Sequence, residues 1–358
     1  MTTDPTLEPK EPSRGEPDGA RAATAIVTGA GGWLGQNLVR ALAPHRTQVR
    51  ALVDRAEDAP LLELVGPSVQ VLVGDVRAPT TADQLLAGAE GATVFHAAGV
   101  IHPPGRTRPF YDVNVGGTQY LLDRARRAGS GRFLHVSSNS VFGANPHRDH
   151  RFTEDSPFNP YLGYGESKLE AEQLVQRSHD RGDLETVVLR PPWFYGPFQP
   201  PRQTQFFAAI RRGRFPLVGD GHQRRSMAYT GSLVSALLLA ETAEKAPGQS
   251  YWIADEEPYE LRHVLDVVRE ALEAEGLEVS PRRPRLPLVA STAAARADAL
   301  LQGAGRYVQP LHVLGELRDT IACDISKAHQ DLGYEPVATL VEGMRSSIRW
   351  CLARGEQL

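Results

Sequence analysis

The sequence predicts an α/β fold with a doubly wound parallel sheet, and three observations carry this prediction. Six short runs rich in aliphatic and β-branched residues recur in the first 190 residues, as expected for strands buried on both faces of a parallel sheet. Segments with helical periodicity separate these runs. A chain of 358 residues, 41% of them hydrophobic, is also long enough to bury such a core. The predicted strands are residues 23–28, 48–53, 69–73, 93–97, 132–136 and 185–189.

Composition narrows the possible partners and compartments. The formal net charge is −4 and there is no long basic run, so we expect no nucleic-acid partner. The two cysteines are too few for a disulfide framework or a metal cluster, which favours a reduced, cytoplasmic setting and no metal. No apolar stretch approaches the length of a membrane span, so we expect no membrane partner. Residues 1–22 lack an apolar signal core and predict a disordered tail.

A glycine-rich turn joins the first predicted strand to a helix. Gly29, Gly32 and Gly35 are spaced three residues apart. The first permits a tight turn, the second lets the backbone approach a pyrophosphate, and the third lets helix and strand pack closely. The N-terminus of the helix that follows offers free N–H groups and partial positive charge to phosphates. This context predicts a dinucleotide site in a Rossmann-like domain. Two further contacts are expected inside the turn, at Trp33 and Leu34.

The end of the second predicted strand indicates which dinucleotide is bound. Asp54 lies about 20 residues after the glycines, where a carboxylate can accept hydrogen bonds from the adenosine ribose hydroxyls. It would repel a 2′-phosphate, so NAD is favoured over NADP. Arg55 could pair with that extra phosphate, which keeps NADP possible. The alternative is that Asp54 only caps a turn.

The remaining predicted cofactor contacts follow the third and fourth strands. An acid at the end of the third strand could hold the adenine amino group. Small residues after the fourth would let a dinucleotide lie across the strand end, and an amide in the next helix could brace the backbone or a proton-relay water. These residues are Asp75, Val76, Ala97, Ala98, Gly99 and Asn114.

A helix opening near residue 161 carries the candidate catalytic residues. Tyr164 and Lys168 are four residues apart, so both side chains lie on one helix face. A free tyrosine titrates near pH ~10, and a neighbouring lysine cation is expected to lower that pKa. Such a phenol can exchange a proton with a carbinol or carbonyl oxygen, worth roughly 10²–10⁴-fold in rate.

Ser138 and Asn139 follow the fifth strand, at the sheet edge where open α/β sheets bind ligands. The serine hydroxyl could hydrogen-bond a substrate oxygen beside Tyr164. A serine at a strand end is also an ordinary turn residue, and the Tyr–Lys pair could belong to a solvated helix face. The order of glycine turn, acid, serines and Tyr–Lys helix along one chain favours catalysis.

Together these motifs resemble the extended short-chain dehydrogenases/reductases of the NAD-dependent epimerase/dehydratase family. Thr28-Gly29-x-x-Gly32-x-x-Gly35 is similar to the family's cofactor motif, and Tyr164-x-x-x-Lys168 is similar to its catalytic pair. Ser138 matches the serine or threonine of the catalytic triad. The resemblance runs from about residue 23 to the C-terminus. It implies that the lysine also holds the nicotinamide ribose, and that the protein is a homodimer formed through the Tyr–Lys helix and its neighbour.

The same resemblance places substrate contacts in the second half of the chain. Residues 190–197 are similar to the Arg-Pro…Tyr-Gly-Pro segment beside the nicotinamide, which makes Pro191 a cofactor contact. Trp193 and Phe194 in this segment could wall the active site or belong to the core. Two arginines complete the expected substrate contacts. These are Arg202, at the start of the next helix, and Arg225, which matches an arginine that binds the diphosphate in nucleotide-sugar enzymes. The alternative for Arg225 is a solvated basic turn.

The predicted organisation is a tail at 1–22, a cofactor-binding Rossmann domain at 23–190, and a substrate-binding region at 191–358 interleaved with the Rossmann sheet. Residues 281–311 form an insertion that could cap the pocket, and similar insertions occur in hydroxysteroid dehydrogenase-like relatives. Asn139-Ser140 stands where nucleotide-sugar dehydratases of this family carry an Asp-Glu pair, which disfavours dehydration.

Three functions remain open on the sequence alone. The leading one is an NAD(P)-dependent oxidoreductase or epimerase that transfers hydride at a carbinol or ketone carbon of a small-molecule substrate, a nucleotide-activated sugar. The alternative is a hydroxysteroid dehydrogenase-like reductase or dehydrogenase of an apolar alcohol or ketone. The third, a catalytically silent NAD(P)-sensing regulatory protein, is disfavoured because Ser138, Tyr164 and Lys168 are all intact.

Overall fold

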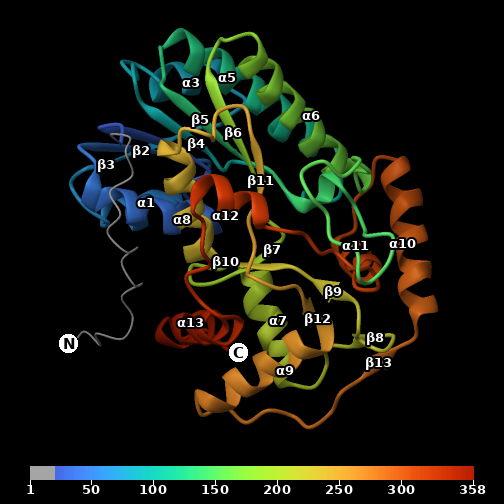
Figure 1. Ribbon diagram of the computed structural model, residues 1–358. Helices are drawn as coiled ribbons and strands as arrows, with labels where there is room; N and C mark the ends of the chain where they lie inside the picture. The colour runs from blue at the N-terminus through green and yellow to red at the C-terminus, as the bar shows by residue number, and fades with distance from the viewer. Residues whose placement is uncertain (1–20) are drawn as a thin grey trace.

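The computed structural model describes residues 21–358 around a seven-stranded parallel sheet (Figure 1). The strand order is β11-β6-β5-β4-β1-β2-β3, and every neighbouring pair is parallel. The order reverses direction between β1 and β4, so a crevice for ligands is expected at their carboxyl ends. The strands are β1 (Thr24–Thr28), β2 (Gln48–Val53), β3 (Val69–Val73), β4 (Thr93–His96), β5 (Arg132–Val136), β6 (Glu185–Arg190) and β11 (Ser250–Trp252). The predicted α/β fold class is confirmed.

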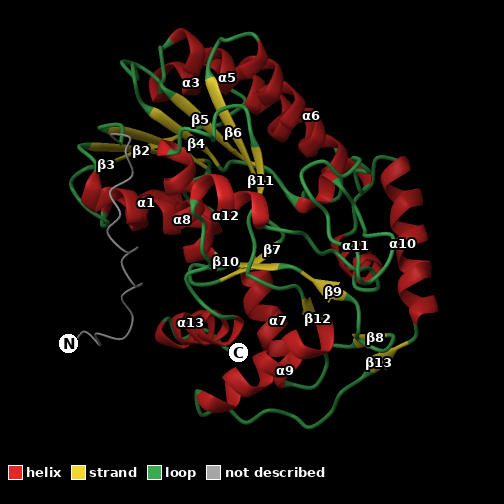
Figure 2. Cartoon of the chain, in the orientation of Figure 1, coloured by secondary structure: helices red, strands yellow, loops and turns green. Residues whose placement is uncertain are grey.

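Helices cover both faces of the sheet (Figure 2). Alternate strand residues point to opposite faces, so Val27 packs in one apolar cluster and its neighbour Ile26 in the other. The first cluster is covered by α1 (Trp33–Leu42), α8 (Thr230–Thr242) and α12 (Ser326–Leu332). The second is covered by α3 (Pro79–Leu85), α5 (Thr118–Arg127) and α6 (Leu162–Asp180). Shorter elements complete this half: α2 (Ala59–Glu63), α4 (Arg108–Tyr111), the π-helix η4 (Asp112–Gly117), and the 3₁₀ turns η2 (Ala43–His45), η3 (Ala56–Asp58) and η5 (Asn139–Val141).

The second half of the chain builds a smaller layer below the carboxyl edge of the sheet and returns β11 to the sheet itself (Figure 1). A separate apolar cluster holds this layer together, with Phe207, Val264 and Met344 fully buried at its centre. Its helices are α7 (Pro201–Arg211), α9 (Leu261–Ala274) and α13 (Leu340–Ala353). Three short strand pairs join them: β7 (Trp193–Tyr195) with β10 (Met227–Tyr229), β9 (Arg224–Arg225) with β12 (Tyr259–Glu260), and β8 (Leu217–Val218) with β13 (Arg285–Leu286).

The predicted insertion forms two helices, α10 (Leu288–Gly303) and α11 (Gln309–Glu316), which pack against each other and beside the first turn of α6. We call this pair the cap. None of the described helices combines the length and the apolar character that crossing a bilayer requires. The tail predicted for residues 1–22 lies, up to residue 20, outside the described residues.

Candidate active site

The glycine turn between β1 and α1 accepts only glycine at two positions. Gly29 has φ +66°, and a Cβ there would lie 2.7 Å from the backbone nitrogen of Ala98. A Cβ on Gly35 would lie 2.1 Å from the Gly29 carbonyl oxygen. Helix α1 begins after Gly32 without a side-chain cap, which leaves its first N–H groups available for an anion. The turn therefore fits a cofactor pyrophosphate.

Trp33 links this turn to the loop after β7. Its indole Nε1 donates to the carbonyl oxygens of Gly196 (3.1 Å) and Pro197 (2.9 Å). Its ring lies 4.9 Å from that of Phe194. The side chain of Leu34 is buried in the core. At Trp33 and Leu34, therefore, only the backbone groups are available to contact a cofactor.

The groups after β2 favour an unphosphorylated ribose. Asp54 is exposed at the strand end. Arg55 donates to both carboxylate oxygens of Asp58 at 3.0 Å, so its guanidinium already has an anionic partner. Asp58 was not foreseen as a site residue, although its i+3 spacing from Arg55 is a readable signal. A Cβ on Gly31 would lie 2.7 Å from Asp58 Oδ2, which places this carboxylate beside the glycine turn.

The predicted contacts after β3 and β4 line the same edge of the sheet. The carboxylate of Asp75 binds Arg77, which lowers the pKa of Asp75. Val76 is buried against Gly117, where a Cβ would lie 2.7 Å from a Val76 methyl group. After β4 the chain is partly open to solvent over three small residues, as a ligand floor requires. These are Ala97, Ala98 and Gly99.

Asn114 lies in the π-helix η4 and ties two segments together. Its Oδ1 accepts from Val100 N (2.8 Å), and its Nδ2 donates to Val100 O (3.1 Å) and Ser167 Oγ (3.0 Å). Single π-turns are frequent at functional sites. The amide therefore braces the loop after β4 against the catalytic helix, one of the two roles expected for it.

The serine turn after β5 is pressed against the first turn of α6. Ser138 Oγ accepts from Ser140 N at 3.2 Å, and Tyr161 N donates to Ser140 O at 2.9 Å. A Cβ on Gly165 would lie 2.5 Å from that same carbonyl oxygen, so glycine is needed for the close approach. Leu162, in the left-handed region at φ +52°, stores backbone strain beside the site. This contact brings Ser138 and Tyr164 together.

The prediction that Lys168 lowers the pKa of Tyr164 is wrong. Burial of the phenol raises its pKa to about 12, and the groups that favour the phenolate are Ser138, through a hydrogen bond, and the nearby Arg202. The ammonium of Lys168 instead donates to Val136 O (2.8 Å) and lies 3.3 Å from His135 Nε2. Burial lowers the pKa of Lys168 to about 8. Because Lys168 points to the end of β5, it does not lower the pKa of the phenol.

A buried ion pair supports this arrangement and was not predicted. Arg190 donates to both oxygens of Glu172 (3.1 and 2.8 Å), and both side chains are almost fully buried. Glu172 is one turn beyond Lys168 on α6 and favours the charged form of that lysine. The Arg190-Pro-Pro segment is thereby fixed to the catalytic helix.

The predicted substrate contacts divide into two groups. Arg202 is exposed on the first turn of α7 yet lies close to Tyr164 and Tyr307, and it has no carboxylate ion-pair partner within residues 21–358. The Asn139 N–H donates to the carbonyl oxygen of buried Pro191 (3.2 Å), and its Oδ1 accepts from Ser138 Oγ (3.5 Å). These residues border Tyr164, the candidate catalytic tyrosine.

The other predicted substrate residues are structural in this conformation. Trp193 packs edge-on against Phe206 at 5.2 Å and joins the core of the lower layer, as Phe194 joins the core beside Trp33. Arg225 is buried and donates to the backbone carbonyl of Glu316 at the end of α11. A solvated turn is therefore wrong for Arg225, because its guanidinium is closed off from solvent.

Residues of α4 and of the loop between the two cap helices also lie near Tyr164, and the sequence did not reveal them. Phe110 stands between the catalytic ring of Tyr164 (5.8 Å between centroids) and the ring of Tyr307 (5.5 Å). The Tyr307 hydroxyl hydrogen-bonds His102 Nδ1 at 2.5 Å. Burial and the charge of Arg202 lower the pKa of His102 to about 3, so its imidazole is neutral. No local motif marks the contacts of Tyr307, since they join segments about 200 residues apart.

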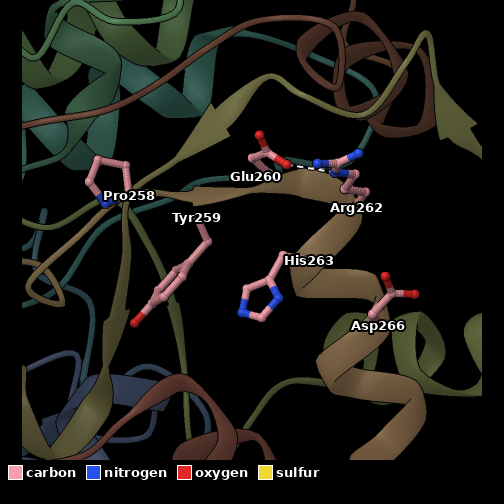
Figure 3. A pocket seen from close by; sticks show the side chains of 6 residues that line it. All are labelled: Pro258, Tyr259, Glu260, Arg262, His263 and Asp266. Atoms are coloured by element: carbon pink, nitrogen blue, oxygen red, sulfur yellow. Dashed lines mark hydrogen bonds and ion pairs between the residues drawn. The ribbon is translucent and has the colours of Figure 1, made fainter.

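A hollow of about 370 Å³ lies elsewhere, on β12 and α9 (Figure 3). Tyr259 and His263 line it, and Glu260 forms an ion pair with Arg262 at 2.6 Å on its rim. None of the predicted site residues lines this hollow, so the convergence around Tyr164 is the candidate active site.

A family model for the NAD-dependent epimerase/dehydratase family matches residues 25–254. The chain belongs to this family. Its members are NAD-dependent enzymes, so the predicted family, enzyme class and cofactor NAD are confirmed.

Two relatives and one solved structure are similar to this chain. It is 44% identical over 347 residues to an uncharacterized protein of Sinorhizobium fredii, covering 94% of this chain and 97% of the relative. It is 32% identical over 352 residues to a 3 beta-hydroxysteroid dehydrogenase/Delta 5-->4-isomerase of Mycobacterium tuberculosis, covering 93% and 91%. UDP-glucuronic acid 4-epimerase from Bacillus cereus in complex with NAD has the same fold, with a TM-score of 0.72, 23% identity, and coverage of 92% and 99%.

Proposed function

We propose that the protein interconverts a secondary alcohol and a ketone, with Tyr164 exchanging the proton on the substrate oxygen. The hydrogen bond between Ser138 and Tyr164, with Lys168 on the same helix fixed at the end of β5, carries this proposal. Because the phenol pKa is about 12, Tyr164 is protonated near neutral pH and suited to donate to a carbonyl oxygen, as ketone reduction requires. Ser138 holds that oxygen within reach of the phenol.

The residues present fit NAD, which supplies the hydride acceptor or donor when bound. The N–H groups at the start of α1 would hold the pyrophosphate, and Asp54 would accept from the adenosine ribose. Lys168, fixed at the end of β5, would hold the nicotinamide ribose. Since Arg55 is paired with Asp58, we propose NAD rather than NADP as the physiological cofactor.

We propose an apolar ketone or alcohol as the substrate, the alternative reading of the sequence. The surroundings of Tyr164 are aromatic: Phe110 packs against it, and Tyr307, from the loop between the two cap helices, packs against Phe110. Arg225, the residue expected to bind a diphosphate, is buried and bonded to the cap backbone. A relative that acts on steroids by name is 32% identical across most of both chains.

A nucleotide-activated sugar is the second candidate, and Arg202 is the observation that favours it. An unpaired guanidinium beside the catalytic tyrosine suits a phosphate or carboxylate oxygen. An epimerase would use the same three catalytic residues and return the hydride to the opposite face.

The two candidates are separated by one panel of assays. Purified protein with NADH is offered hydrophobic ketones, including 3-ketosteroids, and separately UDP-, dTDP- and GDP-sugars. Oxidation of NADH by the ketones, without thermal stabilisation by nucleoside diphosphates, supports the apolar substrate. Thermal stabilisation of the protein by UDP, dTDP or GDP, together with turnover of the matching sugar, would instead support a nucleotide-activated sugar as the substrate.

We also propose a homodimer formed through α5 and α6. Tyr120 on α5 and Tyr111 beside it are exposed aromatic side chains on this face, and Tyr111 donates to Glu166 of α6 at 2.6 Å. Light scattering after size exclusion tests this proposal. A dimer that Tyr120→Glu converts to a monomer supports it, and a wild-type monomer contradicts it.

A further inference from the structure

Helix α10 has its polar face inside and its apolar face outside. Its inward residues Ser291, Asp298 and Gln302 are buried. On the outward face Val289 is 77% exposed and Leu300 is 78% exposed. A surface helix of a globular protein normally has the opposite arrangement. The outward apolar face consists of Leu288, Val289, Ala293, Ala299 and Leu300.

The inverted polarity is fixed by the contacts of the inner face. Asp298 accepts from His312 Nδ1 (2.8 Å) and from Gln302 Nε2 (3.0 Å). Ser291 Oγ donates to Leu314 O at 2.6 Å. The Gln302 side-chain oxygen accepts from Gly163 N (3.4 Å), one residue before Tyr164. The helix cannot rotate to bury its leucines without breaking this buried network, so its apolar face must stay outside.

Within residues 281–315 the charged residues are almost all arginines, and the exposed acids near the start of α10, Asp220 and Asp266, are paired with Arg148 and Arg283. Between residues 281 and 315 the only acidic residue is Asp298, which is buried, whereas the whole chain has a net charge of −4. Arg296 lies within the outward face. Arg106 and Arg306 are joined by a backbone bridge just beyond the C-terminal end of the helix. Arg282 and Arg285 precede its N-terminal end, and both are exposed.

We propose that the outward face of α10 docks the protein on a membrane surface that contains anionic phospholipid. Exposed apolar side chains on one helix face, flanked by arginines, are features of an interfacial helix. A second copy is a poorer occupant, because a two-fold contact would set these arginines against the same arginines of the other copy. The inner face of the same helix borders the catalytic tyrosine, so docking brings the cleft close to the bilayer.

This inference revises the expectation of no membrane partner, which rested on the absence of a spanning segment. A helix that lies in the interface needs no spanning length. The inference also stands independently of the substrate, since it rests on the outer face of α10 rather than on the cleft.

The test is co-sedimentation of the full chain with vesicles. One set is pure phosphatidylcholine and the other is an equimolar mixture of phosphatidylcholine and phosphatidylglycerol. We expect binding to the mixed vesicles that weakens at high salt. Leu300→Glu should reduce the vesicle partition coefficient at least about tenfold, because a leucine side chain that inserts into the bilayer is replaced by a charge. Arg296→Gln should reduce it roughly fivefold.

Leu64→Glu is the matched control. Leu64 is 85% exposed and lies at the end of α2 beside β3, the opposite edge of the molecule from α10 (Figure 1). This variant should bind vesicles like the wild type, and all variants should keep their soluble activity and thermal midpoint. Equal loss in L64E and L300E, absence of binding to mixed vesicles, or an L300E-sensitive dimer without vesicle binding would each overturn the proposal.

Discussion

The nucleotide-binding half and the cap region both contribute residues around Tyr164, but they do so through different kinds of structure. The first half positions its groups through backbone geometry: the turn at Gly29, the free N-terminus of α1 and the strand ends. The cap positions Tyr307 through side-chain bonds between segments distant in sequence, such as that to His102. The difference teaches that the glycine turn of this molecule is encoded locally, whereas the surroundings of Tyr307 are encoded in long-range packing.

The largest expected effect is at the catalytic tyrosine. Tyr164→Phe should lower kcat by about 10²–10⁴-fold, because the phenolic proton is lost while the ring still packs on Phe110. Steady-state kinetics and NADH binding by fluorescence measure it, and cofactor affinity should be unchanged. Tyr111→Phe, on the neighbouring helix, is the control and should keep full activity. Equal turnover by Y164F and the wild type would show that Tyr164 takes no part in the proton transfer.

The next largest effect is on stability in the same half. Glu172→Gln should destabilise the fold by about 3–5 kcal/mol, because Arg190 would be left as an unpaired buried charge. Chemical denaturation measures this change. Glu185→Gln breaks the more exposed Arg132–Glu185 pair and should cost at most about 1 kcal/mol. Similar midpoints for the two variants would show that the buried pair is not what fixes the Arg190 segment.

Weakening the buried hydrogen bonds of the cap should change the affinity for the substrate. Asp298→Asn weakens the bonds to His312 and Gln302, at a cost of about 1–3 kcal/mol in cap stability. We expect a raised KM, a nearly unchanged kcat and faster proteolysis within residues 281–316. Asp266→Asn, in an exposed ion pair with Arg283, serves as the control and should change none of these. A kcat loss as large as that of Y164F would mean that the cap takes part in the proton transfer.

The smallest expected effect is that of the Arg202 charge on the pKa of Tyr164. Alcohol oxidation needs the phenolate, so its rate should rise with pH throughout the range below about 12. Arg202 favours the phenolate, and Arg202→Gln should raise the pKa of Tyr164, move the profile to higher pH and slow oxidation by less than about tenfold. Ketone reduction near neutral pH should be unaffected by this change in pKa. An unchanged pH dependence of alcohol oxidation in R202Q would show that Arg202 acts only on the substrate.

The sequence predicted the sheet because buried strands and glycine turns are local patterns. Gly29, Gly32 and Gly35 could be assigned roles in advance, since each role depends on backbone space within one strand–turn–helix unit. The direction of the Tyr164 pKa could not be predicted, because it depends on burial and on Arg202, which lies on another helix. Helical spacing set Tyr164 and Lys168 on one face but could not show that the lysine turns to Val136.

The insertion at residues 281–311 was predicted, but the side-chain contacts of the cap could not be, for the same reason. An alanine-rich segment predicts a helix, and α10 is one, but nothing in it shows that Asp298 and Gln302 face inward. The partner of Arg225 is likewise a backbone carbonyl 91 residues away, invisible to any motif.

The most direct test of the account is the fate of the hydride. The protein is incubated with NADH deuterated at C4 and with a panel of ketones, and the products are examined by mass spectrometry. The account predicts deuterium on the new carbinol carbon with the wild type and a 10²–10⁴-fold slower transfer with Y164F. Tight NADH binding with no deuterium in any product, or equal transfer by Y164F, would contradict it.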